Sequence, residues 1–228
     1  MMQKFWFEKM KINETFFVFD MDDTLYKEID FYYSGVSAVV KYVERNFGVS
    51  LDKTKSWEFQ TNRDVLNDIC SAFSLPLKLK EQLLWIYRLH HPRISLHSDA
   101  KIVIDTLIKK SCGVAILTDG RSITQRNKQI ALGLSHIPIF ISEEWGSSKP
   151  DKCRFVYIEK TFSATNYVYI GDNPQKDFVA PNSMGWKTIG LRGDNKNIHS
   201  QDTASFEQTY HPTLWINKLI ELFDYYDT

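Results

Sequence analysis

The chain has few cysteines, no long apolar run and no excess of charge of either sign. Its three cysteines, Cys70, Cys112 and Cys153, are far apart and form no CxxC pair, which argues against zinc or redox chemistry and favours free thiols in a reducing compartment. No segment approaches the roughly 20 apolar residues needed to cross a bilayer. Lys plus Arg number 28 and Asp plus Glu number 28, without a basic run, so binding to nucleic acid or to a membrane surface is not favoured.

Length and composition limit the possible architectures. At 228 residues the chain fits one core with a sizeable insertion, since a domain has roughly 150 residues. Hydrophobic residues make up 43% and charged residues 25%, which is ordinary for a soluble globular protein. Residues 1–9 mix charge with aromatic side chains and lack an apolar stretch of signal-peptide length, so we expect a cytoplasmic protein.

The apolar run of residues 16–19, Phe-Phe-Val-Phe, ends at a cluster of carboxylates. An aromatic and β-branched run is typical of a strand that is buried on both faces of a parallel sheet. Asp20 and Asp22 follow its carboxyl end, which is where ligands bind in open α/β sheets. The alternative is an Asp-rich turn without further function, because aspartate side chains also stabilise turns.

Residues 27–92 have a helical pattern and contain no convincing strand. Apolar residues recur at helical spacing over 33–47, where Gly48 marks a helix end, and again over 63–73 and about 78–90. We therefore predict a small helical domain over 27–92, inserted into a core formed by residues 1–26 and 93–228.

Helix and strand patterns alternate after this insertion. Strands are predicted over 113–118, 137–141, 167–170 and 186–189. Helices are predicted over 99–110, 121–132, 150–160, with Pro150 as the first residue, and 212–223. This alternation favours an α/β fold, namely a Rossmann-like parallel sheet flanked by helices, with the inserted α-helical domain as a second unit.

Four separated motifs lie at predicted strand ends, in a fixed order. They are Asp20-Met21-Asp22-Asp23-Thr24, Leu117-Thr118-Asp119-Gly120, Ser148-Lys149-Pro150, and Gly171-Asp172 followed by Asp177. The ordered set resembles the four motifs of the haloacid dehalogenase (HAD) superfamily, which begin with DxDxT and end with GDxxxxD. The resemblance covers nearly the whole chain, whereas Thr-Asp-Gly or Lys-Pro alone would be weak indications.

The resemblance implies phosphoryl transfer, for which a protein supplies a nucleophile and positive charge around the transferred group. It implies that Asp20 attacks phosphorus to form an aspartyl-phosphate, while Asp22 acts first as general acid and then as general base. It also implies contacts to the substrate phosphate from the Thr118 hydroxyl, the backbone N–H groups of Asp119 and Gly120, and the Lys149 ammonium group.

The same resemblance implies a Mg²⁺ site. Asp20, Asp172 and the backbone carbonyl of Asp22 would be ligands, and Asp177 would lie behind them or bind through water. Oxygen ligands of these types suit Mg²⁺. Lys149 would also keep the crowded carboxylates ionised.

The resemblance further narrows the activity. An acid at Asp22 argues against a dehalogenase or a phosphonate hydrolase, and the lack of membrane spans argues against a P-type ATPase. A helical insertion between the first and second motifs is the superfamily's type-one cap, which acts as a lid. We expect Mg²⁺-dependent hydrolysis of a small phosphomonoester, such as a sugar phosphate, a nucleotide or a phosphoglycolate-like compound. A phosphomutase of the β-phosphoglucomutase type and a catalytically inactive HAD-fold binding protein remain as alternatives.

Specificity is less well defined by the sequence. Side chains that could line the cleft, each of which also fits a solvated or structural role, are Lys27, Glu28, Asp30, Tyr32, Tyr33, Arg63 and Arg88. His90, His91 and His97 lack a helical ligand spacing, so we expect no metal cluster there. The expected partner is the small-molecule substrate, without nucleic acid or membrane, and the oligomeric state stays open.

Overall fold

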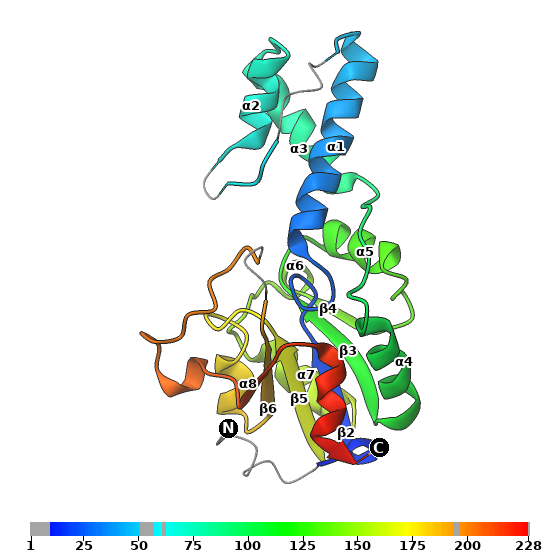
Figure 1. Ribbon diagram of the computed structural model, residues 1–228, viewed down its shortest axis with the longest axis vertical. Helices are drawn as coiled ribbons and strands as arrows, with labels where there is room; N and C mark the ends of the chain where they lie inside the picture. The colour runs from blue at the N-terminus through cyan, green and yellow to red at the C-terminus, as the bar shows by residue number, and fades with distance from the viewer. Residues whose placement is uncertain (1–9, 51–56, 61–62, 194–196, 228) are drawn as a thin grey trace.

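The computed structural model describes residues 10–50, 57–60, 63–193 and 197–227. Its core is a six-stranded parallel sheet in the order β4-β3-β2-β5-β6-β7, seen in the lower half of Figure 1. The strands are β2 (Thr15–Phe19), β3 (Gly113–Thr118), β4 (Ile139–Ile141), β5 (Asn166–Gly171), β6 (Lys187–Leu191) and β7 (Leu214–Ile216). The predicted α/β architecture with a parallel sheet is confirmed.

Eight α-helices are assigned within the described residues. They are α1 (Glu28–Phe47), α2 (Val65–Ala72), α3 (Lys80–Leu89), α4 (Ala100–Lys110), α5 (Ser122–Ala131), α6 (Ser142–Trp145), α7 (Cys153–Thr161) and α8 (Val179–Ser183). Four 3-10 helices accompany them: η2 (Ile12–Glu14), η3 (Leu77–Leu79), η4 (Gln208–Tyr210) and η5 (Leu219–Asp224). In the same part of the chain, no helix is both long and apolar enough to cross a membrane.

The sheet is buried on both faces because residues of its central strand alternate between two apolar clusters. Phe17 and Phe19 pack on the side of α4 and η5. Phe16 and Val18 point to the opposite side, where α7 and α8 cover the sheet. All four side chains are at most 2% exposed, which explains the uninterrupted apolar run in the sequence.

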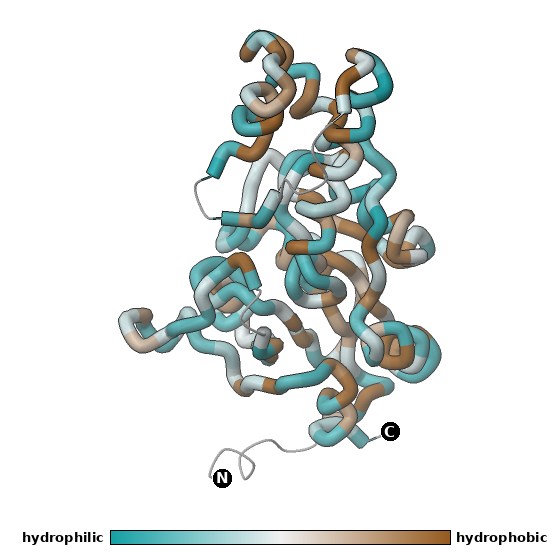
Figure 2. Tube along the Cα trace, turned by 45° about the horizontal axis from the view of Figure 1, so that its top comes forward, coloured by the Kyte–Doolittle hydropathy of each residue, from teal (hydrophilic) through white to brown (hydrophobic). Residues whose placement is uncertain are grey.

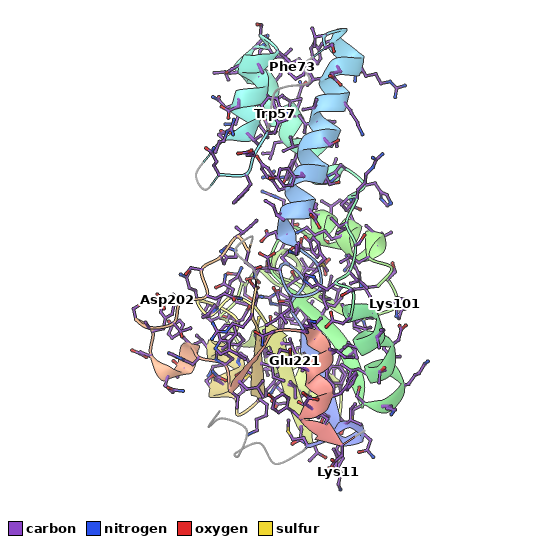
Figure 3. All side chains as sticks on the ribbon, viewed as in Figure 1. Lys11, Trp57, Phe73, Lys101, Asp202 and Glu221 are labelled. Atoms are coloured by element: carbon purple, nitrogen blue, oxygen red, sulfur yellow. The ribbon has the colours of Figure 1, made fainter. Side chains whose placement is uncertain are left out.

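Helices α1, α2 and α3 form a separate group above the sheet in Figure 1. Trp57 and Phe73, labelled in Figure 3, lie in this group. Brown and teal segments mix along these helices in Figure 2, as expected where one face of each helix packs inward. The group has its own apolar core, which contains Val36, Val39, Val43, Val65, Leu66, Ile69, Cys70, Phe73 and Leu83. The three helices predicted in this region are confirmed, while the domain limits 27–92 stay a prediction.

The C-terminal prediction was wrong. Residues 212–223 do not form one helix but a sixth strand, β7, followed by the 3-10 helix η5. Leu214 and Ile216 alternate and pair with β6, whereas Leu219 and Leu222 have the three-residue spacing of a 3-10 turn. Hydrogen bonding of this segment to the edge strand β6 therefore outweighs its tendency to form a helix.

Other element limits differ less. Helix α7 begins at Cys153 rather than at Pro150, and the Asp151 side chain accepts a hydrogen bond from the Cys153 N–H at 2.7 Å. A short parallel pair of β1 (Met10–Lys11) and β8 (Tyr226–Asp227) was not predicted. The predicted core segment 1–26 includes residues 1–9, which lie outside the described residues. All three cysteines are free, as expected.

Candidate active site

The acidic and hydroxyl residues singled out by the motifs meet at one edge of the sheet. Asp20 directly follows β2, Thr118 ends β3 and Asp172 directly follows β5. Because β2 pairs with both β3 and β5 in parallel, these three strand ends are neighbours. They open onto a cavity of about 60 Å³ whose lining residues are Asp20, Asp22, Glu28, Thr118, Asp119, Asp172, Lys176 and His199.

Lys149 joins two buried carboxylates, one of which lines this cavity. Its Nζ donates to Asp20 Oδ1 at 2.7 Å, to Asp177 Oδ1 at 2.6 Å and to the Tyr169 hydroxyl at 3.0 Å. The Lys149 side chain is only 1% exposed. Burial lowers the pKa of Lys149, but the charges of Asp177 and Asp20 outweigh it and raise the pKa well above its usual value. The ammonium group is therefore fixed in the charged state.

A glycine allows Asp177 to fold back against the end of β5. Asp177 Oδ2 accepts the N–H of Asn173 at 2.8 Å, while Oδ1 is bound to Lys149. A Cβ atom at Gly171 would lie 2.6 Å from Asp177 Oδ2, so only glycine leaves room for this approach. Both oxygens of Asp177 are thereby engaged by hydrogen-bond donors of the protein.

The residues present fit a divalent cation of the Mg²⁺ type. One carboxylate oxygen from each of Asp20, Asp172 and Asp177 lies within 4.8 Å of the others, and all three residues are buried. Burial, followed by the charges of Asp177 and Asp20, raises the pKa of Asp172 well above its usual value. Burial likewise raises the pKa of Asp20, to about 7, although Lys149 opposes the shift. A hard cation at this point would balance the unmatched negative charge with the oxygen donors it prefers.

Asp22 is turned toward helix α5 rather than into the three-carboxylate group. Its Oδ1 accepts from Lys128 Nζ at 2.7 Å and from the Tyr26 hydroxyl, and its Oδ2 accepts from Gln125 Nε2 at 2.9 Å. Burial disfavours ionisation of Asp22, but the Lys128 charge and these hydrogen bonds outweigh it and lower the pKa. The carboxylate is thus held in the ionised state at the cavity wall.

The second motif divides its tasks among three residues. Thr118 is 1% exposed and its Oγ1 accepts from Gln125 Nε2 at 2.6 Å. The Asp119 carboxylate accepts hydrogen bonds from the backbone N–H of Lys149 at 3.1 Å and from Arg154 Nη2 at 2.6 Å, so it holds the backbone at Lys149 in place. The Gly120 N–H was expected to bind a phosphoryl oxygen. It instead donates a hydrogen bond to Ser142 Oγ at 2.9 Å.

Of the specificity candidates, Glu28 lines the cavity, through the first turn of α1. Burial and the charge of Asp22 raise the pKa of Glu28 to about 8. Arg63 pairs instead with Asp68 at 2.5 Å, and Arg88 stacks on Trp85. His90 bonds to Ser34 at 3.0 Å, and among the described residues no group of three metal-ligating side chains includes a histidine.

The sequence analysis missed several residues that complete the site. Gln125 and Lys128 come from α5, Tyr169 from β5, and Lys176 and His199 from loops at the cavity wall. Gln125 and Lys128 had a usable indication, because two polar residues at i and i+3 follow the second motif within one predicted helix. Lys176 also sits inside the fourth motif. His199 had no such indication, since only the fold brings its loop to the site.

Comparison with known sequences identifies the family. The sequence profile of the haloacid dehalogenase-like hydrolases matches residues 17–191, which includes all four motifs. The chain belongs to this family. It is 26% identical over 230 residues to the glyceraldehyde 3-phosphate phosphatase of Methanocaldococcus jannaschii, covering 91% of this chain and 94% of that protein. It is also 26% identical over 186 residues to the phosphoserine phosphatase of Thermus thermophilus, covering 76% and 74%.

Solved structures of HAD members share the fold. The HAD-hydrolase YfnB of Bacillus subtilis, whose structure contains magnesium, superposes with a TM-score of 0.60 at 21% identity, covering 95% of this chain and 98% of that one. A HAD family hydrolase of Deinococcus radiodurans, with bound phosphate and sodium, gives a TM-score of 0.59 at 16% identity, covering 92% and 93%. At such identities the likeness applies to the fold alone.

Proposed function

We propose that the chain is a HAD-type phosphatase that hydrolyses a small phosphomonoester through an aspartyl-phosphate intermediate and requires Mg²⁺. The observation that carries this proposal is the placement of Asp20. Its carboxylate lies at the end of the central strand, bonded to a buried lysine, beside a second buried carboxylate and within the same cavity as the Thr118 hydroxyl. Two relatives named as phosphatases support the same reaction class.

In the proposed first step, an Asp20 oxygen forms a bond to phosphorus while the bond from phosphorus to the alcohol oxygen breaks. Lys149 engages Oδ1, so Oδ2 is the attacking atom. Asp22, at the cavity wall, is ionised in the substrate-free structure, so it binds a proton from solvent when the ester enters and passes this proton to the leaving oxygen. In the second step a water attacks phosphorus, Asp22 accepts its proton, and the bond to Asp20 breaks to release inorganic phosphate.

We assign the Mg²⁺ ligands to Asp20, Asp172 and the backbone carbonyl of Asp22, with Asp177 behind them. When bound, the ion would offset charge on the phosphoryl oxygens and on the acids around it. The assignment of Asp177 follows its hydrogen bonds, because Lys149 and the Asn173 N–H already engage its two oxygens. Lys149, with the Thr118 hydroxyl and the Asp119 N–H, would supply the remaining contacts to phosphate, while the Gly120 N–H is bonded to Ser142.

Helices α1 to α3 are proposed as a cap over the cavity. They have an apolar core separate from the sheet, and Glu28 in the first turn of α1 reaches the cavity wall. Hydrogen bonds between α5 and the end of α3 join the two units, from Thr124 to the Arg88 carbonyl at 3.4 Å and from Asn127 to the Leu89 carbonyl at 3.4 Å. The few polar contacts fit a lid that closes over substrate.

The substrate class follows from the small cavity and its charge. A volume of about 60 Å³ accommodates a phosphoryl group with little more, so the alcohol portion must extend toward the cap. Glyceraldehyde 3-phosphate and phosphoserine are the first compounds to test, since the two relatives are named for them.

The free thiols fit a reducing compartment, which supports the proposed cytoplasmic location.

The test is phosphate release from a panel of phosphomonoesters, with Mg²⁺ and with chelator. The panel contains both compounds above, phosphoglycolate, sugar phosphates and nucleotides. Asp20→Asn should reduce turnover at least a thousandfold, while Asp105→Asn, an exposed acid on α4, should leave it unchanged. Full activity in Asp20→Asn would reject the nucleophile assignment. Transfer of phosphate only between sugar hydroxyls would favour a mutase, and no turnover at all would favour a binding protein.

A further inference from the structure

Helix α5 buries polar residues and exposes apolar ones. Gln125, Lys128 and Gln129 are 1%, 4% and 5% exposed, whereas Ile123 and Ile130 are 43% and 53% exposed. A helix that packs only for stability turns its apolar side chains inward, because burying a polar group without a partner costs free energy. The inverted pattern indicates that the inward face of α5 has a task other than packing.

Gln129 has a structural task. Its Nε2 donates to the carbonyl oxygens of Leu134 and Ile137, at 3.0 and 2.7 Å, and so holds the turn that follows α5. Gln125 and Lys128 instead point to residues of the candidate active site. Gln129 therefore stabilises the fold, whereas Gln125 and Lys128 contact the candidate active site.

Lys128 pairs with Asp22 and lies over two aromatic rings. Its Nζ lies 2.7 Å from Asp22 Oδ1, 4.3 Å from the ring centroid of Phe31 and 5.9 Å from that of Tyr26. The rings attract the cation through their faces, and they also limit the directions in which the lysine can move. Because Phe31 belongs to α1, this lysine touches the proposed cap and the carboxylate at the same time.

Gln125 links the two polar groups of the cavity wall. Its Nε2 carries two hydrogens and lies 2.9 Å from Asp22 Oδ2 and 2.6 Å from Thr118 Oγ1. Since the Thr118 oxygen accepts here, its own hydrogen is left to be donated elsewhere, and Thr118 is one of the residues that line the cavity. Gly120 has a φ of 143°, and a Cβ atom there would lie 3.0 Å from Gln125 Cδ, so the glycine makes room for this side chain.

We propose that Lys128 and Gln125 are positioning residues of the phosphatase reaction: Lys128 fixes the carboxyl group of Asp22 for proton transfer to the leaving oxygen, and Gln125 fixes both Asp22 and the Thr118 hydroxyl. This inference rests on the proposed function. The two residues differ in what they hold, because Lys128 forms its ion pair with the proton-transfer group, whereas Gln125 also holds a group that contacts the phosphoryl oxygens.

This difference predicts two signatures that a merely structural role would not produce. An alkyl leaving group needs a proton as the ester bond breaks, whereas 2,4-dinitrophenolate leaves without one. Loss of Lys128 should therefore slow alkyl esters selectively. Loss of Gln125 should slow both kinds of ester, because the phosphoryl contact of Thr118 is common to them.

The experiment measures kcat/KM for glyceraldehyde 3-phosphate, phosphoserine and 2,4-dinitrophenyl phosphate with saturating Mg²⁺. This quantity covers the steps up to release of the leaving group. Lys128→Met should lower kcat/KM for the alkyl ester that is turned over by about 10- to 100-fold, a part of the effect of general acid catalysis, and for the dinitrophenyl ester by less than about 3-fold. Gln125→Leu should lower both by about 10-fold or more. Arg126→Met, which removes an exposed cation of the same helix, should change neither.

A second measurement tests whether Lys128 acts through Asp22. In an Asp22→Asn background, adding Lys128→Met should produce less than about a 3-fold further loss on the alkyl ester, because the group that it positions is already disabled. The double variant also removes both charges of the buried pair, so it stays testable if Lys128→Met alone fails to fold. Lys128→Gln keeps a donor and should recover part of the activity.

The outcomes separate this inference from the proposed function. Wild-type protein without phosphatase activity on any ester would overturn the proposed function and this inference with it. Active wild type together with equal losses on alkyl and dinitrophenyl esters in Lys128→Met, or with a full multiplicative loss in the double variant, would overturn the positioning role alone. An unchanged Lys128→Met would do the same.

Discussion

Replacing Asp172 by asparagine should stabilise the metal-free protein. Carboxylate oxygens of Asp172, Asp20 and Asp177 lie within 4.8 Å of one another, and Lys149 bonds only to the latter two. At an effective dielectric constant of about 20, two unit charges at that separation repel by about 3.5 kcal/mol. Asparagine has nearly the same shape and removes the charge, so the repulsion disappears without a cavity.

The magnitude has an upper limit set by protonation. The pKa of Asp172 is raised in the folded state, so the folded protein keeps a proton that the unfolded chain releases, and its stability falls as the pH rises above about 4. This cost grows by about 1.4 kcal/mol per pH unit for as long as the folded protein keeps the proton, and it is present at pH 7. We expect Asp172→Asn to gain about 2–4 kcal/mol there in the presence of chelator, or about 5–15 °C in the unfolding midpoint.

The assay is thermal unfolding with chelator and with Mg²⁺. Mg²⁺ at 100 times its dissociation constant should stabilise wild type by about 2.7 kcal/mol and Asp172→Asn by much less. The difference between the two unfolding midpoints should therefore become smaller or change sign. Asp105→Asn, which changes an exposed acid paired with Lys101, should shift the midpoint little in either condition. A lower midpoint for Asp172→Asn in chelator, or an undiminished response to Mg²⁺, would refute the reasoning.

Three further predictions concern other parts of the molecule. Lys149→Met leaves Asp20 and Asp177 buried without their cation and should cost about 3–5 kcal/mol in urea unfolding with chelator, while exposed Lys152→Met should stay within about 0.5 kcal/mol. Because the pKa of Glu28 is raised from 4.5 to about 8, wild type should lose stability as the pH rises across that interval. In Glu28→Gln the unfolding free energy should depend less on pH over the same interval, and parallel curves for the two proteins would contradict this. Leu83→Ala, at a site 1% exposed, should cost about 2–5 kcal/mol and speed amide hydrogen exchange in α1–α3 before the sheet, unlike Leu77→Ala at a site 60% exposed; uniform acceleration would argue against a separate cap.

Much of the fold was predictable because its patterns are local. The run 16–19 is apolar on both faces, and its strand is indeed central, with α4 and η5 on one side and α7 and α8 on the other. The alternation of strands and helices predicted the parallel sheet. The last strand was missed because Leu214 and Ile216 are too few to outweigh the helical spacing that Leu219 and Leu222 add.

The site was predictable to the extent that its residues occur in ordered motifs. The structure places Asp20, Thr118 and Asp172 on three neighbouring strand ends, which sequence order and strand pairing explain. His199 is different, because a lone histidine outside a motif has no local pattern that marks it. Its proximity to the site depends on how the loop after β6 packs, which only the tertiary structure determines.

The topology of the sheet has a consequence for how the nascent chain acquires its structure. Strand β2 is made early, but its partners across the register, Val114 beside Phe17 on one side and Val168 on the other, are synthesised much later. A wholly apolar strand therefore stays unpaired during translation, while α1–α3 fold first because the residues in contact there are closer together in the sequence. The segment 16–19 is thus where premature release or slow translation would promote aggregation, and where a chaperone that binds extended apolar peptides would protect the chain.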